Sequence, residues 1–253
     1  MKTLVTMGRG GTGKTSFTAL MAKYFIETGE TPLLLIDLDP DQNLAEMVGI
    51  DLESSGVKTI ADLITDTFIR RGGTTRGVAP TERIESRIWE EGLYEGGSFD
   101  LIAVGTKWIE GCYCLPDSAL KGALGTIVKN YRYVLIDSPA GLEHLNRKVT
   151  TDVDDIFDII GPSGRSFEHV HRAYRIIREV RINAGRFSLV GSYLFPESEE
   201  ERAESILPHK YLGKVVKDPI VQEYVLSGRS LLDIPSDAPG YLSMKQILKK
   251  AGY

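Results

Sequence analysis

The segment Gly8–Thr15 places the strongest limit on what this chain folds into, because it fits the pattern G-x-x-x-x-G-K-[ST]. An apolar run, Thr3–Met7, precedes it, and apolar side chains recur at helical spacing from Phe17 onward. The order strand, glycine-rich loop, helix is the context that a phosphate-binding loop requires. The alternative, a glycine-rich turn that binds nothing, is disfavoured because the lysine, the threonine, the strand and the helix all occur together.

The rest of the chain repeats this alternation of strands and helices. Gly29 is placed to end the first helix, and Pro32 precedes a second apolar run, Leu33–Ile36. This run is apolar at successive positions, which is typical of a parallel strand covered by helices on both faces. Further strands are predicted at 101–104, 133–136, 156–160, 189–194 and 212–216. The sequence therefore predicts a doubly wound α/β fold, with a mainly parallel sheet flanked by helices.

A length of 253 residues corresponds to about one or two domains. No repeat and no linker rich in proline and serine interrupts it, so we expect residues 1–253 to form a single domain. The stretch 51–98 is richer in charge and glycine and is interpreted as a peripheral elaboration, with helices joined by an exposed loop. Residues 242–250 fit a short amphipathic helix, for which docking on the protein's own core is favoured over membrane attachment.

Composition excludes several classes of protein. The chain has 30 Lys+Arg against 35 Asp+Glu and a net charge of -5, which argues against a nucleic-acid or membrane partner. Its longest aliphatic run, 33–36, is far short of the roughly 18 residues that span a bilayer, and no secretory leader is recognisable. We therefore expect a cytoplasmic protein. Only 2 cysteines occur, with one residue between them, so a disulfide scaffold is excluded.

The glycine-rich loop supplies the chemistry for binding a nucleotide phosphate. Its backbone N–H groups converge on phosphate oxygens, and the following helix directs its positive end toward the same anion. We expect Lys14 to lie against the β- and γ-phosphates, and the Thr15 hydroxyl to bind Mg²⁺ with Asp137 as its acidic partner. The candidate nucleotide-binding residues are Gly8, Arg9, Gly10, Gly11, Thr12, Gly13, Lys14, Thr15, Ser16, Asp37, Asp137 and Gly141.

This loop resembles the deviant Walker A loop of the MinD/ParA/nitrogenase-iron-protein group of ATPases, which normally reads K-G-G-x-G-K-[ST]. The resemblance implies ATP or ADP and Mg²⁺ as cofactors. It also implies a homodimer, because the first lysine of that loop reaches across to the partner's nucleotide. Here Arg9 stands in that position. A guanidinium keeps the charge and can bind two phosphate oxygens, so a catalytic role across the interface is expected, and an exposed arginine beside the nucleotide is the alternative.

The same resemblance assigns roles to acidic residues at the ends of the strands. It implies that Asp39 orients the attacking water and that Asp37 helps to hold Mg²⁺, whereas a simple turn-forming Asp-x-Asp-Pro is the alternative. The segment Asp137–Gly141 resembles the second switch loop, whose glycine approaches the γ-phosphate. The asparagine that this group uses to read adenine is missing after 189–194, so we expect the backbone of 196–198 to contact the base.

A Cys-x-Cys pair, Cys112 and Cys114, extends the resemblance to one family. Together with Gly141-Leu142-Glu143-His144, it resembles the CooC family of ATPases, which support nickel insertion into carbon monoxide dehydrogenase. The resemblance implies nickel or zinc bound by the cysteines between two subunits, and a nickel enzyme such as carbon monoxide dehydrogenase as the client. Two thiolates supply half of a tetrahedral site, and a two-fold axis supplies the rest. Unliganded small apolar residues or a redox-sensitive pair are the alternatives.

The four histidines add little to this interpretation. His169 and His171 are two residues apart on a predicted helix, so we expect them to be exposed and not to act as joint ligands. His209 is isolated, and His144 lies beside the second switch. Two other functions remain open: a ParA/MinD-like positioning ATPase that acts on DNA or a membrane, and an iron–sulfur carrier ATPase.

Overall fold

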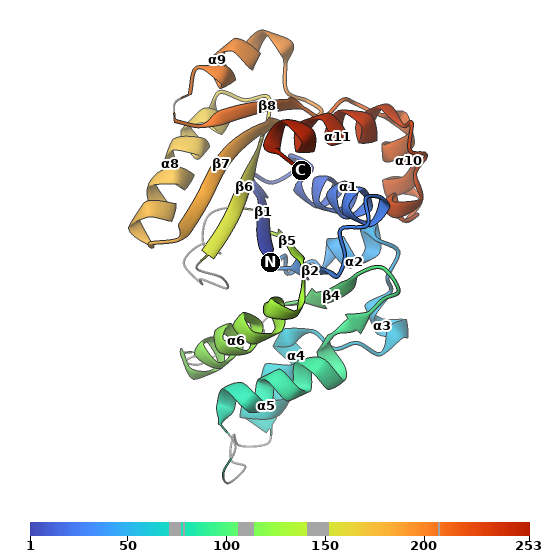
Figure 1. Ribbon diagram of the computed structural model, residues 1–253, viewed down its shortest axis with the longest axis vertical. Helices are drawn as coiled ribbons and strands as arrows, with labels where there is room; N and C mark the ends of the chain where they lie inside the picture. The colour runs from blue at the N-terminus through green and yellow to red at the C-terminus, as the bar shows by residue number, and fades with distance from the viewer. Residues whose placement is uncertain (71–76, 78, 106–113, 141–151, 207) are drawn as a thin grey trace.

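An eight-stranded sheet forms the centre of the molecule (Figure 1). The computed structural model describes residues 1–253 except 71–76, 78, 106–113, 141–151 and 207, and except the side chains of 68–70 and 114–117. The strand order is β3-β4-β2-β5-β1-β6-β7-β8, and only the β3–β4 pair is antiparallel. The strands are β1 Lys2–Gly8, β2 Leu33–Asp37, β3 Tyr94–Glu95, β4 Asp100–Ala103, β5 Tyr133–Asp137, β6 Asp152–Ile160, β7 Asn183–Gly191 and β8 Lys210–Lys214.

Helices cover both faces of this sheet, and each layer has its own apolar core. One core lies under α1 Lys14–Glu27, α2 Asn43–Met47, α10 Pro219–Leu226 and α11 Pro239–Ala251. The other lies under α4 Ile60–Ile64, α5 Pro80–Arg87, α6 Cys114–Ile127, α8 Arg165–Glu179 and α9 Glu200–Glu204. Shorter elements are α3 Leu52–Ser55, the π-helical turns Thr65–Arg70 and Ile88–Gly92, and the 3₁₀ turns Val128–Asn130, Glu197–Glu199 and Leu231–Asp233. The predicted doubly wound α/β fold is confirmed.

The predicted strands are all present but differ at their ends: β6 begins four residues before the predicted 156–160, and β8 ends two residues before the end of the predicted 212–216. β7 runs over Asn183–Gly191, so the prediction of 189–194 was wrong at both ends. Its first half carries exposed polar residues that hide the pattern, whereas Tyr193 and Leu194 are apolar but exposed beyond the strand, 38% and 49% respectively. The stretch 51–98 contains the expected helices, and it also contributes the short edge strand β3, which the sequence did not predict.

Helix α11 packs against α1 and closes one face of the sheet (Figure 1). Tyr241, Met244, Ile247 and Leu248 are all buried in the core that includes α1, and the helix ends at Gly252 in a left-handed conformation. The expectation that this helix docks on the protein's own core is confirmed. Among the described residues, no helix is both long enough and apolar enough to cross a bilayer.

Candidate functional site: a phosphate loop and an adjoining pocket

The glycine-rich loop leaves β1 at the carboxyl edge of the sheet, between β5 and β6. Gly8 has φ 144°, and a Cβ at this position would lie 2.5 Å from the carbonyl oxygen of Ile159, so only glycine fits. Gly13, with φ 87°, is the N-cap of α1 and provides no side-chain cap. The first N–H groups of a 14-residue helix are therefore free of side-chain capping and face the loop, which is the arrangement that binds anions.

The loop is held in shape by hydrogen bonds to one carbonyl group. The Thr12 hydroxyl donates to the carbonyl oxygen of Arg9 at 2.9 Å, and Nζ of Lys14 donates to the same oxygen at 3.4 Å. Lys14 is buried, whereas Arg9 is half-buried and Gly10 and Gly11 are exposed. The buried ammonium group thus lies beside the loop backbone, where it is available to bind a phosphate oxygen.

An acidic site fit for Mg²⁺ lies next to Lys14. The Asp137 carboxyl accepts hydrogen bonds from the hydroxyls of Thr15 and Thr18, the latter at 3.3 Å. Its Oδ2 is buried and has no hydrogen-bond partner among the described residues. Burial raises the pKa of Asp137 to about 7, against the opposing effects of the Thr15 hydrogen bond and the Lys14 charge. A hydroxyl and a carboxylate are the hard oxygen donors that Mg²⁺ prefers, so these residues fit the ion.

Asp37 and Asp39 lie at the end of β2, but they differ in what they contact. The Asp37 carboxylate accepts backbone N–H groups from Asp39 and Leu44, each at 2.9 Å, and is fully buried. Burial raises the pKa of Asp37 to about 6, although these hydrogen bonds lower it. In this arrangement Asp37 fixes the start of α2 and the loop that carries Asp39. Asp39 is partly exposed, and its Oδ1 accepts the N–H of Asp41 at 3.1 Å.

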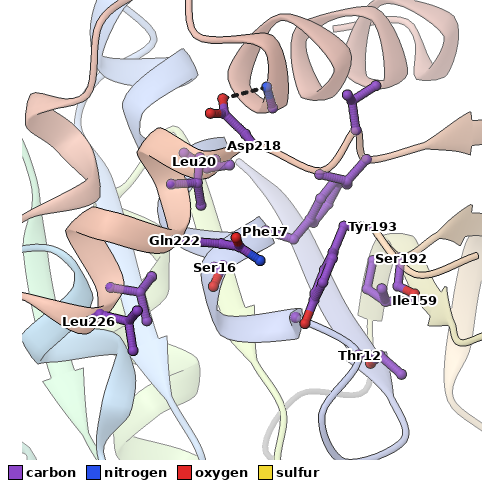
Figure 2. A pocket seen from close by; sticks show the side chains of 16 residues that line it. Thr12, Ser16, Phe17, Leu20, Ile159, Ser192, Tyr193, Asp218, Gln222 and Leu226 are labelled. Carbon is purple, nitrogen blue, oxygen red and sulfur yellow. Dashed lines mark hydrogen bonds between the residues drawn. The ribbon is translucent and has the colours of Figure 1, made fainter.

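A pocket of about 380 Å³ continues from the phosphate loop (Figure 2). Thr12, Gly13 and Ser16 form the end of the pocket nearest the phosphate loop. The opposite wall comes from the segment after β8 and from α10, including the largely apolar residues Val215, Val216, Val221, Val225 and Leu226. Such a pocket, mostly apolar with a few polar groups and open to a phosphate site, suits a flat heterocyclic base.

Three of the polar residues that line this pocket, Ser192, Tyr193 and Gln222, were not among the candidate residues of the sequence. Gln222 extends from α10 over Ser16, and the Tyr193 ring faces it across the pocket (Figure 2). Ser192 is 2% exposed, and its hydroxyl has no hydrogen-bond partner among the described residues. After β7 the pocket is lined by Ser192 and Tyr193. The segment 196–198, which was expected to contact the base, does not line it, and Phe195 is buried against Phe167.

The remaining candidate residues have different outcomes. Cys112 and Gly141 lie outside the described residues, and Cys114 is the first residue of α6, with its side chain also outside them. No group of three or more His, Cys, Asp or Glu suited to a metal ion occurs in the part of the chain that is described. The expectation that His169 is exposed was wrong: its side chain is 11% exposed because α8 packs it toward Asp158. His171 is exposed as predicted, and His209 is buried between Tyr174 and Phe187.

Comparison with known proteins identifies the family. The family model described as AAA domain matches residues 2–186. This chain belongs to that family. It is a P-loop ATPase, and its fold is that of the MinD and ParA ATPases of solved structure, which agrees with the loop and the sheet order described above.

The ATPase is similar in sequence to several known proteins and in fold to several solved structures. It is 30% identical over 251 residues to an uncharacterized ATP-binding protein of Methanocaldococcus jannaschii, covering 98% of this chain and 97% of that protein. It is 29% identical over 189 residues to the carbon monoxide dehydrogenase accessory protein CooC of Rhodospirillum rubrum, covering 72% and 71% of the two chains. The septum site-determining protein MinD of Pyrococcus horikoshii, solved with Mg-ADP, shares the fold, with a TM-score of 0.70, 18% identity, and 99% and 96% of the chains covered.

Proposed function

We propose that this ATPase is an ATP-dependent metallochaperone. It dimerises on binding nucleotide, holds nickel or zinc through Cys112 and Cys114 at the dimer interface, and supports nickel insertion into a carbon monoxide dehydrogenase. The observation that carries the proposal is a Cys-x-Cys pair in a chain that is 29% identical to a carbon monoxide dehydrogenase accessory protein over 72% of its length.

Each residue of the nucleotide site has its own role in binding and hydrolysing ATP. Lys14 and the backbone N–H groups of the loop and of α1 bind the phosphates, while Thr15 and Asp137 hold Mg²⁺, which neutralises charge on the transferred phosphoryl group. Asp39 orients the attacking water, and Asp37, which also fixes the loop that carries Asp39, helps to hold Mg²⁺. Arg9 acts across the dimer on the partner's nucleotide, and the Gly141 N–H approaches the γ-phosphate. The base lies in the pocket beside Gln222 and Tyr193.

Strand topology supports a link between the nucleotide and the cysteines. β2 and β4 are neighbours, and Asp37 pairs with Ala103, the last residue of β4. The chain therefore leaves β4 at the edge of the sheet that carries Asp37 and the phosphate loop, and Cys114 is the first residue of α6. A nucleotide that draws two protomers together at this edge brings the two segments after β4 toward one another. Two Cys-x-Cys pairs then supply the four thiolates of a tetrahedral site.

The direct test measures metal content and molar mass together, using the full chain with ADP and with a nonhydrolysable ATP analogue. We expect one nickel or zinc ion per two chains in a dimer that forms with the analogue. The double substitution Cys112→Ser and Cys114→Ser removes the metal and leaves nucleotide binding intact. Lys14→Ala is the matched control, because it removes the effect of nucleotide on the metal while keeping both thiols.

Other results would support different functions. Metal content that is unchanged by the double cysteine substitution contradicts the metallochaperone. A visible absorption band in dimer purified without oxygen indicates an iron–sulfur cluster at the cysteines. Sedimentation with DNA or lipid vesicles that requires ATP indicates a positioning ATPase.

A further inference from the structure

Asp158 is a buried acidic residue that lies behind the phosphate loop and has no part in the nucleotide site described above. It is 0% exposed, and neither carboxyl oxygen has a hydrogen-bond partner in the described part of the chain. In the sheet Asp158 pairs with Met7, and the next residue, Ile159, pairs with Gly8, where the loop begins. An unpaired buried carboxylate is costly, so such a group either carries a proton or requires a nearby positive charge.

His169 of α8 is the neighbour that offers this charge. Its Nε2 lies 3.8 Å from Oδ1 of Asp158, which is longer than a hydrogen bond but within the range of an ion pair. This nitrogen is also buried without a hydrogen-bond partner among the described residues. These carboxyl oxygens and this imidazole nitrogen are thus buried without a hydrogen bond within the described residues, and a proton on His169 places a positive charge beside the Asp158 carboxylate.

Positive charges of the phosphate loop face this pair. Burial raises the pKa of Asp158 to about 7, and the charge of Lys14 opposes that increase. Burial lowers the pKa of His169, and the charges of Arg9, Lys14 and Arg172 lower it further. The two groups therefore lie within reach of each other's charge, in the field of the residues that bind phosphate.

We propose that Asp158 and His169 are a positioning pair beneath the phosphate loop, which takes up a proton from solvent when nucleotide binds and releases it when nucleotide leaves. The proposal rests on phosphate binding by Lys14 as given under the proposed function. Phosphate oxygens neutralise the field of Lys14 and Arg9 at the pair, so the pair holds its proton more tightly. The effect is reciprocal. As pH rises, Asp158 loses its proton, and its negative charge partly neutralises the positive charge of Lys14, so phosphate binds more weakly.

Calorimetry of Mg-ADP binding in two buffers with different ionisation enthalpies measures the proton directly. At about pH 7.5 we expect the wild-type ATPase to take up a proton fraction approaching one per nucleotide, and its affinity to fall by up to about tenfold per pH unit above neutrality. In Asp158→Asn the proton uptake that the pair contributes disappears, and the affinity for Mg-ADP stays high at alkaline pH. His171→Gln, on the exposed side of the same helix, behaves as wild type.

A second measurement needs no variant at Asp158, so it does not depend on whether that substitution folds. The imidazole resonance of His169, assigned with His169→Gln, is titrated with pH in wild-type protein with and without Mg-ADP. We expect its midpoint to move to higher pH with nucleotide. A midpoint unchanged in saturated protein, or equal proton uptake in wild type and Asp158→Asn, overturns the pair. Absence of any Mg-ADP binding instead contradicts the nucleotide site itself, so the two failures are distinguishable.

Discussion

Glu27, the last residue of α1, links that helix to α11 by a hydrogen bond, and the effect of its substitution on the free energy of unfolding can be calculated. Its Oε2 accepts a hydrogen bond from the Tyr241 hydroxyl at 2.6 Å, its Oε1 accepts one from Ser236 at 2.8 Å, and Lys23 lies 2.9 Å away. Burial by itself raises the pKa of Glu27, but hydrogen bonds from Tyr241, Lys23 and Ser236 outweigh it and lower the pKa to about 2. The folded state therefore holds this carboxylate in its charged form.

The sign and size of the effect follow from this pKa. Because the folded value lies below the unfolded value of about 4.3, the stabilisation is complete above that pH and is lost as pH falls toward 2. A shift of about two units corresponds to about 3 kcal/mol, but the side chain is 32% exposed, and solvent screening reduces this to about 1–2 kcal/mol. We expect Glu27→Gln to lower the free energy of unfolding by that amount at pH 7.

Urea unfolding followed by circular dichroism at pH 7, 5 and 3 measures the effect. The difference between wild type and Glu27→Gln should be largest at pH 7 and should shrink toward pH 3. Glu53→Gln, at an exposed position on α3, is the matched control and should change neither the stability nor its pH dependence. A Glu27→Gln variant as stable as wild type at pH 7, with the same acid sensitivity, would refute the reasoning.

Two further substitutions test the phosphate site. Gly8→Ala forces a Cβ to within 2.5 Å of the Ile159 carbonyl oxygen at φ 144°, so we expect nucleotide binding to fall by more than about tenfold in a fluorescence titration, whereas Gly125→Ala, where a Cβ has open space, keeps wild-type binding. Asp137→Asn removes the carboxylate beside Thr15, so the Mg²⁺ concentration for half-maximal ATP hydrolysis should rise about 10- to 100-fold, and an unchanged Mg²⁺ dependence would exclude Asp137 from the site.

Much of the fold was predictable because buried parallel strands and the phosphate loop carry strong local patterns. β2 and β5 are buried along their whole length, and their apolar runs marked them clearly. β3 consists of two residues at the sheet edge and has no periodicity to detect. The polar first half of β7 was missed for a related reason, since exposed strand residues look like loop residues.

The site was predictable where its residues adjoin the motif, and not where tertiary packing assembles it. The sequence indicated Lys14 and Thr15 as candidates through the loop motif and Asp137 as the end of an apolar strand, and the structure brings Asp137 next to Thr15 and Thr18. The pocket brings together residues more than 180 positions apart, and nothing local marks Ser192 or Gln222 as its lining. Asp158 lies in β6 with three other aspartates, and the sequence does not set it apart from them. Its proximity to His169 depends on how α8 packs, which no spacing rule predicts.

The contribution of Lys14 to nucleotide binding tests the central claim most directly. Calorimetric titration of Mg-ADP into wild type, Lys14→Ala and Lys23→Ala separates the phosphate-binding lysine from a second buried lysine on the same helix, which binds the Leu232 carbonyl oxygen at 2.8 Å. The account predicts one site per chain in wild type and Lys23→Ala, and at least a hundredfold weaker binding in Lys14→Ala, about 3 kcal/mol. Equal affinity in wild type and Lys14→Ala, or no binding to wild type, would contradict it.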